Sequence, residues 1–285
     1  MCGGRRSWAE LCEMLPDNAN TVPICRIRGM VTEDSAAPPG TQTLARGLAV
    51  VRAVADGAAD LRALVERTGL GRSTAHRLVQ LLVREGYLRS GRDGYVLGPT
   101  LIELGFQALH GNPLPVVARP VLEELSEQLQ DTVHLAVRDG SSVLYLDKLP
   151  GSRGAEMRSR IGHRMPLTRT GVGMALLLDS PQEWEQLYQA EAAVEPDLAP
   201  DDDLEAFTAR MREYVKSQVA MDVEDNEPGI RCVAAPIRDA AGTLVGAISV
   251  SATRPYMPAA RMRGLVKVVS RSAQRISAAL GHRTL

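Results

Sequence analysis

Three short helical stretches, with a glycine turn before the third and a hairpin after it, fill residues 44–97. Asp60 is suited to cap the second stretch, and Gly69 supplies the backbone freedom that ends it. The third stretch covers residues 72–85, and its buried face is expected to consist of Ala75, Leu78, Val79 and Leu82. In the first stretch, helical spacing of apolar residues predicts a buried stripe made of Leu44, Leu48, Val51, Val54 and Ala55.

The hydrophobic period changes from helical to alternating after Gly86. Residues 87–90 and 95–97 are typical of two short strands around the turn 91–94. A helix, a short glycine turn, a second helix and a hairpin together predict a winged helix-turn-helix.

Charge divides the chain unevenly. Nine arginines and five acidic residues lie between Thr41 and Thr100, a net charge of +4; since the whole chain carries −1, the remainder carries −5. A basic small segment joined to an acidic larger one is typical of a DNA-binding module with a companion that does not bind DNA. The alternative is a small helical domain with a charged surface.

The start of the third helix is the part expected to enter DNA. A helix fits the major groove, where arginine side chains reach guanine and hydroxyl groups reach phosphate or base edges. The wing arginines are placed to meet an adjacent phosphate run or minor groove. The predicted DNA-binding residues are Arg72, Ser73, Thr74, His76 and Arg77 on the helix and Arg89 and Arg92 on the wing.

Composition shifts and the element pattern divide the chain into four parts. Residues 1–42 have no sustained periodicity and are expected to form a disordered extension; whether translation starts at Met1 or at Met30 is left open. The DNA-binding domain is expected over residues 43–99, a linker helix over 100–115 and a second domain over 116–285.

The second domain mixes hairpins with helices, which predicts an α+β fold with an antiparallel sheet. The expected strands are 133–138, 142–148, 231–238 and 244–251. The expected helices are 116–130, 172–178, 182–190, 204–216 and 259–280. The acid-rich residues 191–205 are interpreted as a solvated loop.

Composition also restricts the class of protein. With 45% hydrophobic residues, the 285-residue chain can bury a sizeable core. No apolar run reaches the roughly 18 residues of a membrane span, and the first residues lack a secretory signal, so a cytoplasmic protein without a membrane partner is expected. Cys2, Cys12, Cys25 and Cys232 match neither a zinc pattern nor a disulfide framework; no metal or cofactor is predicted.

Several segments, in this order and spacing, resemble the IclR family of bacterial transcriptional regulators over about residues 44–281. Residues 68–78 (TGLGRSTAHRL) are similar to its recognition segment and residues 95–98 (YVLG) to its wing exit. In the second domain the resemblance rests on VHLAVRDG at 133–140, IGHRMPL at 161–167, GVG at 171–173, GIRCVAAP at 229–236 and ISVS at 248–251.

The resemblance implies a winged-helix domain, a dimerising linker helix and a GAF-like effector-binding domain. It implies a homodimer, with pairing into tetramers left open, and a small organic effector, often a carboxylate. Family effector contacts come from a glycine loop, an acidic residue, a strand cysteine and two alternating serines. Carried over, these are Met165, Gly171, Val172, Asp222, Cys232, Ser249 and Ser251.

Elementary chemistry agrees with part of this set. Ser249 and Ser251 are two apart on a strand, so both hydroxyl groups share one face. Backbone N–H groups at 171–173, at a helix start, are a candidate anion site. The chain departs from the family at Thr168, where many members have histidine, and the adjacent Arg169 adds a positive charge that favours an anion.

Two other functions remain open at this point. One is an enzyme with Cys232 as nucleophile and His134 or His163 as base, although Cys232 lies in an apolar run that disfavours a reactive thiolate. The other is a constitutive DNA-binding dimer whose C-terminal half only dimerises. The sequence leaves the effector, the operator and the direction of regulation undetermined.

Overall fold

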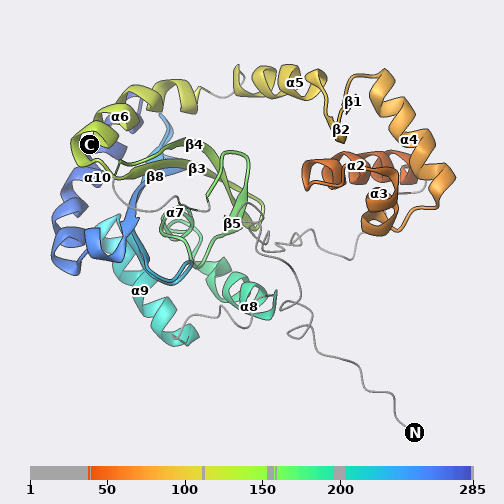
Figure 1. Cartoon of the computed structure of the whole chain (residues 1–285). Helices are drawn as coiled ribbons and strands as arrows, with labels where there is room; N and C mark the ends of the chain where they lie inside the picture. Colours follow the sequence, from red (N-terminus) through yellow and green to blue (C-terminus); the bar gives the residue numbers. More distant parts are fainter. Residues whose placement is uncertain are drawn as a thin grey trace, which may run out of the picture.

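The architecture was obtained as a computed structural model, which describes residue 38 and residues 40–110, 113–152, 157, 159–194 and 203–283. Of the extension expected over residues 1–42, all but the last few positions lie outside the described residues. Figure 1 shows a small N-terminal unit of helices and a hairpin, which α5 links to a larger unit built on a sheet.

The N-terminal unit is the predicted winged helix-turn-helix. Asp60 caps the second helix by accepting a hydrogen bond from Ala63 N at 2.8 Å, and Gly69 ends it with a φ of +68°. Val50, Leu64 and Leu88 are fully or almost fully buried between the elements. The elements are α2 (Gln42–Ala55), α3 (Leu61–Thr68), α4 (Arg72–Arg84), β1 (Leu88–Gly91) and β2 (Gly94–Leu97).

The buried stripe expected on α2 is wrong in its first half. Leu44 and Leu48 are 66% and 48% exposed, and Ala55 is exposed as well. The buried residues of α2 are Val50, Ala53 and Val54, because only the C-terminal half of the helix packs against its neighbours. The spacing is helical, as predicted, but none of the residues that the structure describes buries the first two leucines.

The wing is fixed to the helices by a backbone contact. Tyr95 N donates a hydrogen bond to Ala59 O at 2.7 Å, which joins β2 to the start of α3. A Cβ atom at Gly94, whose φ is +117°, would overlap with the same Ala59 carbonyl group. Glycine is therefore required here, and the hairpin is held in a set position beside α4.

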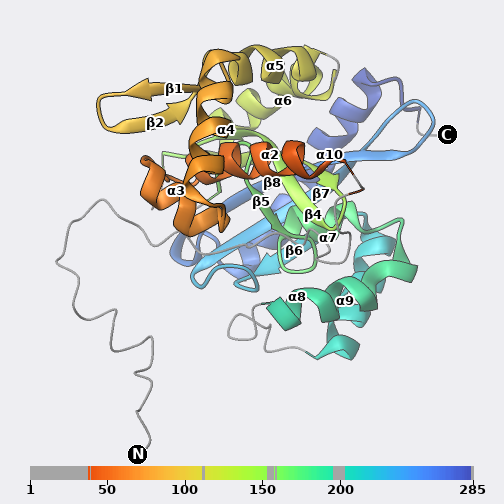
Figure 2. The ribbon, with the colours of Figure 1, turned by 90° about the vertical axis from the view of Figure 1, so that its right-hand side faces the viewer.

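The second unit is a six-stranded antiparallel sheet with helices on both faces, in the order β5-β4-β3-β8-β7-β6. In Figures 1 and 2, α6 and α10 cover one face and α7, α8 and α9 lie on the other. The strands are β3 (Thr132–Asp139), β4 (Ser142–Leu149), β5 (Arg164–Pro166), β6 (Ala220–Val223), β7 (Ile230–Arg238) and β8 (Leu244–Thr253). The helices are α5 (Pro99–His110), α6 (Leu114–Leu129), α7 (Gly171–Leu176), α8 (Trp184–Val194), α9 (Leu204–Ser217) and α10 (Ala259–Ala279), with 3-10 turns η1 (Pro181–Glu183) and η3 (Arg254–Tyr256).

This α+β arrangement confirms the predicted fold class, including the four longer strands and the helices. Two edge strands were not predicted, because β5 has three residues and β6 has four, too few for a clear alternation. The solvated loop expected over residues 191–205 is also wrong at its start, since α8 continues to Val194 and buries Glu191.

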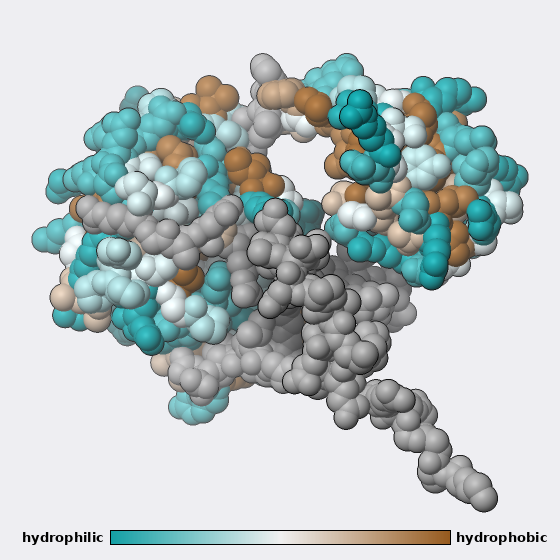
Figure 3. Space-filling model, in the orientation of Figure 1, coloured by the Kyte–Doolittle hydropathy of each residue, from teal (hydrophilic) through white to brown (hydrophobic). Residues whose placement is uncertain are grey.

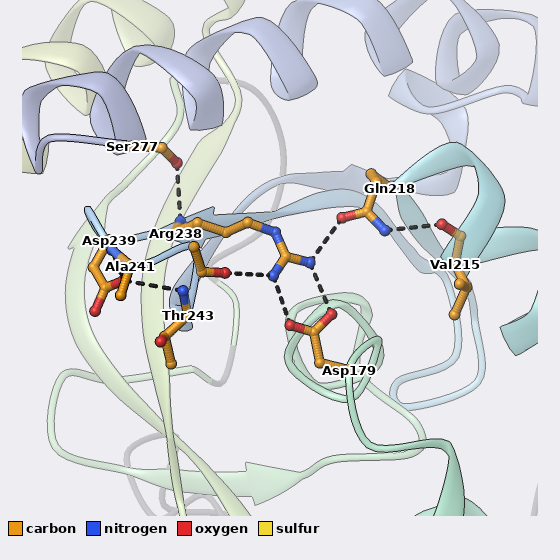
Figure 4. Close-up of polar contacts among 9 residues, drawn as sticks. Asp179, Val215, Gln218, Arg238, Asp239, Ala241, Thr243 and Ser277 are labelled. Carbon is orange, nitrogen blue, oxygen red and sulfur yellow. Dashed lines mark hydrogen bonds and ion pairs between the residues drawn. The ribbon is translucent and has the colours of Figure 1, made fainter. Parts of the chain in front are cut away.

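Arg238 links Asp179, in the segment after α7, to α9 and α10 through hydrogen bonds, as Figure 4 shows. Its guanidinium donates to both carboxylate oxygens of Asp179, at 2.6 and 2.8 Å, and to Gln218 Oε1 at the end of α9. Its backbone N donates to Ser277 Oγ of α10. Arg138, at the matching position of the other hairpin, pairs with Glu183 at 2.5 Å. The segment that follows α7 is therefore held from both hairpins.

Among the described residues, no helix has the length and apolar character that crossing a membrane requires.

Candidate functional site

The N-terminal end of α4 presents polar side chains opposite its buried face. Arg72, Ser73, His76 and Arg77 are exposed and Thr74 is half-buried, while the opposite face packs inward. Gly71 precedes the helix and offers no capping side chain, so no cap from this position occupies the first-turn N–H groups that a phosphate would bind.

The wing adds two further cations. Arg89 on β1 and Arg92 in the turn are exposed. Neither these two nor Arg72 and Arg77 form an ion pair with a described residue, whereas Arg62 and Arg84 pair with Glu66 and Glu85. All seven predicted DNA-binding residues thus lie on α4 or the wing with most of their polar atoms available to a partner.

A second candidate site lies on the face of the sheet that α7 covers. Side chains alternate along each strand, so Val233, Ile248 and Val250 belong to the core under α6 and α10, while the positions between them face α7. The register sets Asp222 opposite Cys232 and Cys232 opposite Ser251. It also sets Ser249 opposite His134 of β3. Polar residues from four strands are thereby gathered on one face.

These residues line a small hollow at the start of α7, with a cavity volume of about 40 Å³. All seven residues expected to contact an effector belong to its wall. Sequence reasoning missed the remaining wall residues, although strand alternation could have indicated His134 and Tyr145. These are His134, Tyr145, Met157, Ser159, Thr170, Asn226, Glu227 and Ile230.

The His134 side chain in the wall of the hollow is hydrogen-bonded and uncharged. His134 Nε2 lies 2.7 Å from Ser159 Oγ, and its Nδ1 lies 3.4 Å from Ser249 Oγ. Burial, and then the nearby Lys148, lowers the pKa of His134 to about 3, so its ring is neutral. The Lys148 ammonium group donates to the carbonyl groups of Met157 and Ser159, which holds that segment over the hollow.

The same geometry argues against a thiol enzyme. Burial raises the pKa of the Cys232 thiol far above its usual range, and Asp222 adds to the effect. A nucleophilic cysteine needs the opposite environment. His134 is engaged by two serines, and His163 is exposed. Within the part of the chain that the structure describes, no group of His, Cys, Asp and Glu residues is placed to hold a metal ion.

The start of α7 is less open to an anion than the sequence suggested. Gly173 N donates a hydrogen bond to Thr170 Oγ1 at 3.1 Å, and the Gly171 backbone N–H donates one to the Cys232 sulfur. Arg169 does not contribute charge to the hollow either: it is 2% exposed and donates to Glu191 O at 3.0 Å. The expectation that Arg169 favours an anion there is therefore wrong.

Glu191 of α8, which sequence reasoning assigned to solvent, holds the loop that leads into α7. Its carboxylate accepts hydrogen bonds from Leu167 N at 2.7 Å, from Thr168 N at 3.1 Å and from the Thr168 hydroxyl group. Burial raises the pKa of Glu191, while these donors oppose the shift. The loop continues directly into Thr170 and Gly171, so Glu191 positions one wall of the hollow from outside it.

Gly171 allows α7 to approach the sheet, and this yields a prediction. A Cβ atom at Gly171 would overlap with Cys232 Sγ. Gly171→Ala is therefore expected to destabilise the domain by about 1–3 kcal/mol through overpacking. In the Gly171→Ala/Cys232→Ala double variant most of that loss should return, because the other neighbours, Asp222 N and Ala234 Cβ, lie at 3.5 and 3.6 Å. Urea unfolding of the four proteins in a double-mutant cycle measures the coupling.

Gly264→Ala is the matched control, because a Cβ there meets nothing within 4 Å. It lies in the middle of α10, where alanine favours the helix, so its stability should stay equal or rise by up to about 1 kcal/mol. Additive effects of Gly171→Ala and Cys232→Ala would contradict the proposed contact.

Comparison with known proteins matches both units. A model of the IclR helix-turn-helix domain matches residues 43–92, and one of the bacterial transcriptional regulator IclR C-terminal domain matches residues 106–278. The transcriptional regulator XynR of Escherichia coli is 29% identical over 255 residues, which cover 86% of this chain and 99% of XynR.

Solved structures agree. The IclR structure of Thermotoga maritima is similar with a TM-score of 0.68 at 26% identity, covering 85% of this chain and all of that one. An IclR homologue of Microbacterium hydrocarbonoxydans, solved with 4-hydroxybenzoate, has the same fold, with a TM-score of 0.72 at 24% identity over 84% of this chain and 98% of the other. The relatives are named as regulators, which supports a DNA-binding regulator over an enzyme. The chain belongs to the IclR family of bacterial transcriptional regulators.

Proposed function

We propose that the chain reads an operator with α4, contacts the adjacent DNA backbone with its wing, and responds to a small organic acid bound in the hollow beside α7. One observation supports the effector half: the seven effector contacts that the sequence predicts, on β5, β6, β7, β8 and α7, all lie in the wall of one hollow. The exposed arginines of α4 and the wing carry the DNA half.

Ligand control requires that the acid binds two arrangements of the protein with different affinity, and DNA affinity then changes by linkage. The wall of the hollow includes both Met165 of the edge strand β5 and the start of α7, so a bound acid would contact two separate elements and could change how they sit against one another. The homologue solved with 4-hydroxybenzoate makes hydroxybenzoates the first acids to test on this chain.

A gel-shift experiment tests the proposal. Purified protein is mixed with the intergenic DNA beside its own gene, at stated salt, with and without 4-hydroxybenzoate and other small organic acids. A sharp shift that survives competitor DNA and moves with one acid supports both halves. Salt-sensitive smearing without sequence preference leaves only non-specific DNA binding. A sharp shift that no acid moves favours the constitutive dimer, and absence of binding contradicts the proposal.

The apolar surface of α5 supports a homodimer. None of residues 101–108 is buried, and Ile102, Leu104 and Phe106 are 63%, 43% and 60% exposed. Figure 3 shows apolar side chains over α5. On α2, Leu44 and Leu48 are exposed in the same way. Exposed apolar helix surface of this kind marks a protein interface, and a second copy of the chain supplies the same surface.

Disrupting this surface gives a prediction. Ile102→Glu with Leu104→Glu is expected to shift the protein from dimer to monomer, because two charges would be buried without partners in the interface. Sedimentation velocity measures the mass. Glu103→Gln, between them on the same exposed helix, is the control and should remain dimeric. A double variant that sediments as the wild type would exclude α5 from the interface.

A further inference from the structure

A groove lies between α6 and α10, on the face of the sheet opposite α7 (Figure 1). Its volume is about 200 Å³, against about 40 Å³ for the hollow beside α7. A cavity of roughly 150 Å³ is enough to hold benzene, so the groove has room for a ligand with a body of one ring. Besides one ion pair, its wall consists of Val121, Leu125 and Gln128 from α6 and Val268, Arg271 and Ser272 from α10.

The floor of the groove is apolar, and an ion pair spans it. Val121 and Leu125 are buried in the core under the two helices, and Val268 packs against the same core. Arg275 of α10 donates to both carboxylate oxygens of Glu124 on α6, at 2.9 and 2.7 Å. These hydrogen bonds lower the pKa of Glu124, so its carboxylate is ionised and the two opposite charges offset each other.

Ser272 brings a buried hydroxyl group to the groove. It is 7% exposed and lines the wall, yet its Oγ is hydrogen-bonded to none of the residues that the structure describes. Ser277 of the same helix shows the usual alternative, because its Oγ donates to Ala273 O, four residues earlier, at 2.8 Å. A buried hydroxyl group without a partner costs free energy, and a hydrogen-bond acceptor bound in the groove would recover that cost.

Arg271, next to Ser272 on α10, supplies a charge. It is exposed, lines the groove and forms no ion pair with a described residue. Since Glu124 and Arg275 offset each other, Arg271 leaves the wall with an uncompensated positive charge. The Gln128 amide lies in the same wall. A guanidinium, a hydroxyl and an amide group are all hydrogen-bond donors to an oxyanion, while the floor accepts an apolar group.

We propose that this groove is a second ligand site, which takes a small monoanion with a compact apolar body. The oxyanion accepts hydrogen bonds from Arg271 and Ser272, and the apolar body packs on the valine and leucine side chains of the floor. The site is separate from the hollow, because the sheet lies between them (Figures 1 and 2). Since α6 is the first helix after the linker helix α5, the ligand contacts the helix of this domain nearest the linker in sequence.

The probe is benzoate, with benzamide as its neutral counterpart and benzylamine as its cationic counterpart. Methyl NMR spectra of the full chain report where each compound binds. Benzoate should shift the methyl signals of Val121, Leu125 and Val268, which form the floor. Val172 and Ile230, in the wall of the hollow, report on the other site. Benzamide and benzylamine should leave the floor signals unchanged at the same concentration, because neither carries an oxyanion.

Two variants test the donors. Arg271→Gln should raise the Kd of benzoate, measured from the shifts of the floor methyl groups, about tenfold or more, because a hydrogen bond between charged groups is lost. Ser272→Ala should also raise the Kd, while its Tm without ligand should not fall, since its hydroxyl group has no partner to lose. Arg263→Gln is the matched control. Arg263 is exposed on the same helix, unpaired among the described residues and outside the groove wall, so the Kd should not change.

The possible failures are distinguishable. Floor signals that do not shift with benzoate overturn the groove site; where Val172 and Ile230 shift instead, the effector function of the hollow stands. Equal effects of Arg271→Gln and Arg263→Gln would show a general effect of charge without a site. A lower Tm of Ser272→Ala would reveal a structural partner of the hydroxyl group. A smaller mass of ligand-free Arg271→Gln in sedimentation velocity would assign the groove to a contact between copies of the chain, which also contradicts the ligand site.

Discussion

Replacing Arg72 and Arg77 together by alanine is expected to weaken operator binding by about two orders of magnitude or more. Each bidentate contact of an arginine with guanine contributes roughly 1–3 kcal/mol of discrimination. Both side chains are exposed at the start of α4 and have no ion-pair partner among the described residues, so the fold loses nothing with them. Fluorescence anisotropy with a labelled operator, at fixed salt, measures the affinity.

Arg84→Ala is the matched control, because it removes the same charge from the other end of α4, where Arg84 pairs with Glu85 at 3.0 Å. It should reduce affinity by far less, through the general electrostatic term alone. Arg77→Lys tests the mechanism further, since it keeps the charge but cannot form a bidentate contact. If the double variant binds as the wild type, or if Arg84→Ala is equally impaired, α4 does not read bases with its N-terminal end.

The assignment of α4 and the wing could be predicted from sequence because the signals are local. Asp60 and Gly69 determine where α3 begins and ends, and the apolar period of α4 marks its exposed face without reference to any other element. Leu44 and Leu48 show the limit of this reasoning. Helical spacing of apolar residues indicates that one face of a helix is buried. It does not say whether the residues that bury that face belong to the same chain.

The hollow was predictable in part for a similar reason. Alternation places Ser249 and Ser251 on one face of β8, and the resemblance to a family supplied Asp222 and Cys232. His134 and Tyr145 could have been found by the same alternation on β3 and β4, but only the register shows that His134 faces Ser249.

Glu191 could not be found from sequence, since an acid-rich stretch is normally solvated. Its role depends on how α8 packs over a loop more than 20 residues earlier in the chain. The misassigned Arg169 has the same cause: its charge was visible, but its burial beside Glu191 was not.

Glu191→Ala is expected to destabilise the effector domain by about 3–5 kcal/mol, the range for breaking a buried charged network. The substitution leaves Leu167 N, Thr168 N and the Thr168 hydroxyl group without the acceptor they share. Each buried donor without an acceptor costs about 1–3 kcal/mol, and Arg169 also loses a neighbouring negative charge. Urea unfolding followed by the fluorescence of Trp184, which is bonded to Leu177 O beyond α7, measures the loss.

Glu185→Ala is the control on the same helix, where the carboxylate is exposed and accepts only from Gln189; it should change stability by less than about 0.5 kcal/mol. Glu191→Gln separates hydrogen bonding from folding. Its amide keeps one acceptor but turns a donor toward the N–H groups of the loop, so this variant should fold, with an intermediate loss. Because the loop leads into Thr170 and Gly171, the same variant should also lose the response of the gel shift to the organic acid that moves it in the wild type. Equal stability of Glu191→Ala and Glu185→Ala would show that α8 does not hold the loop.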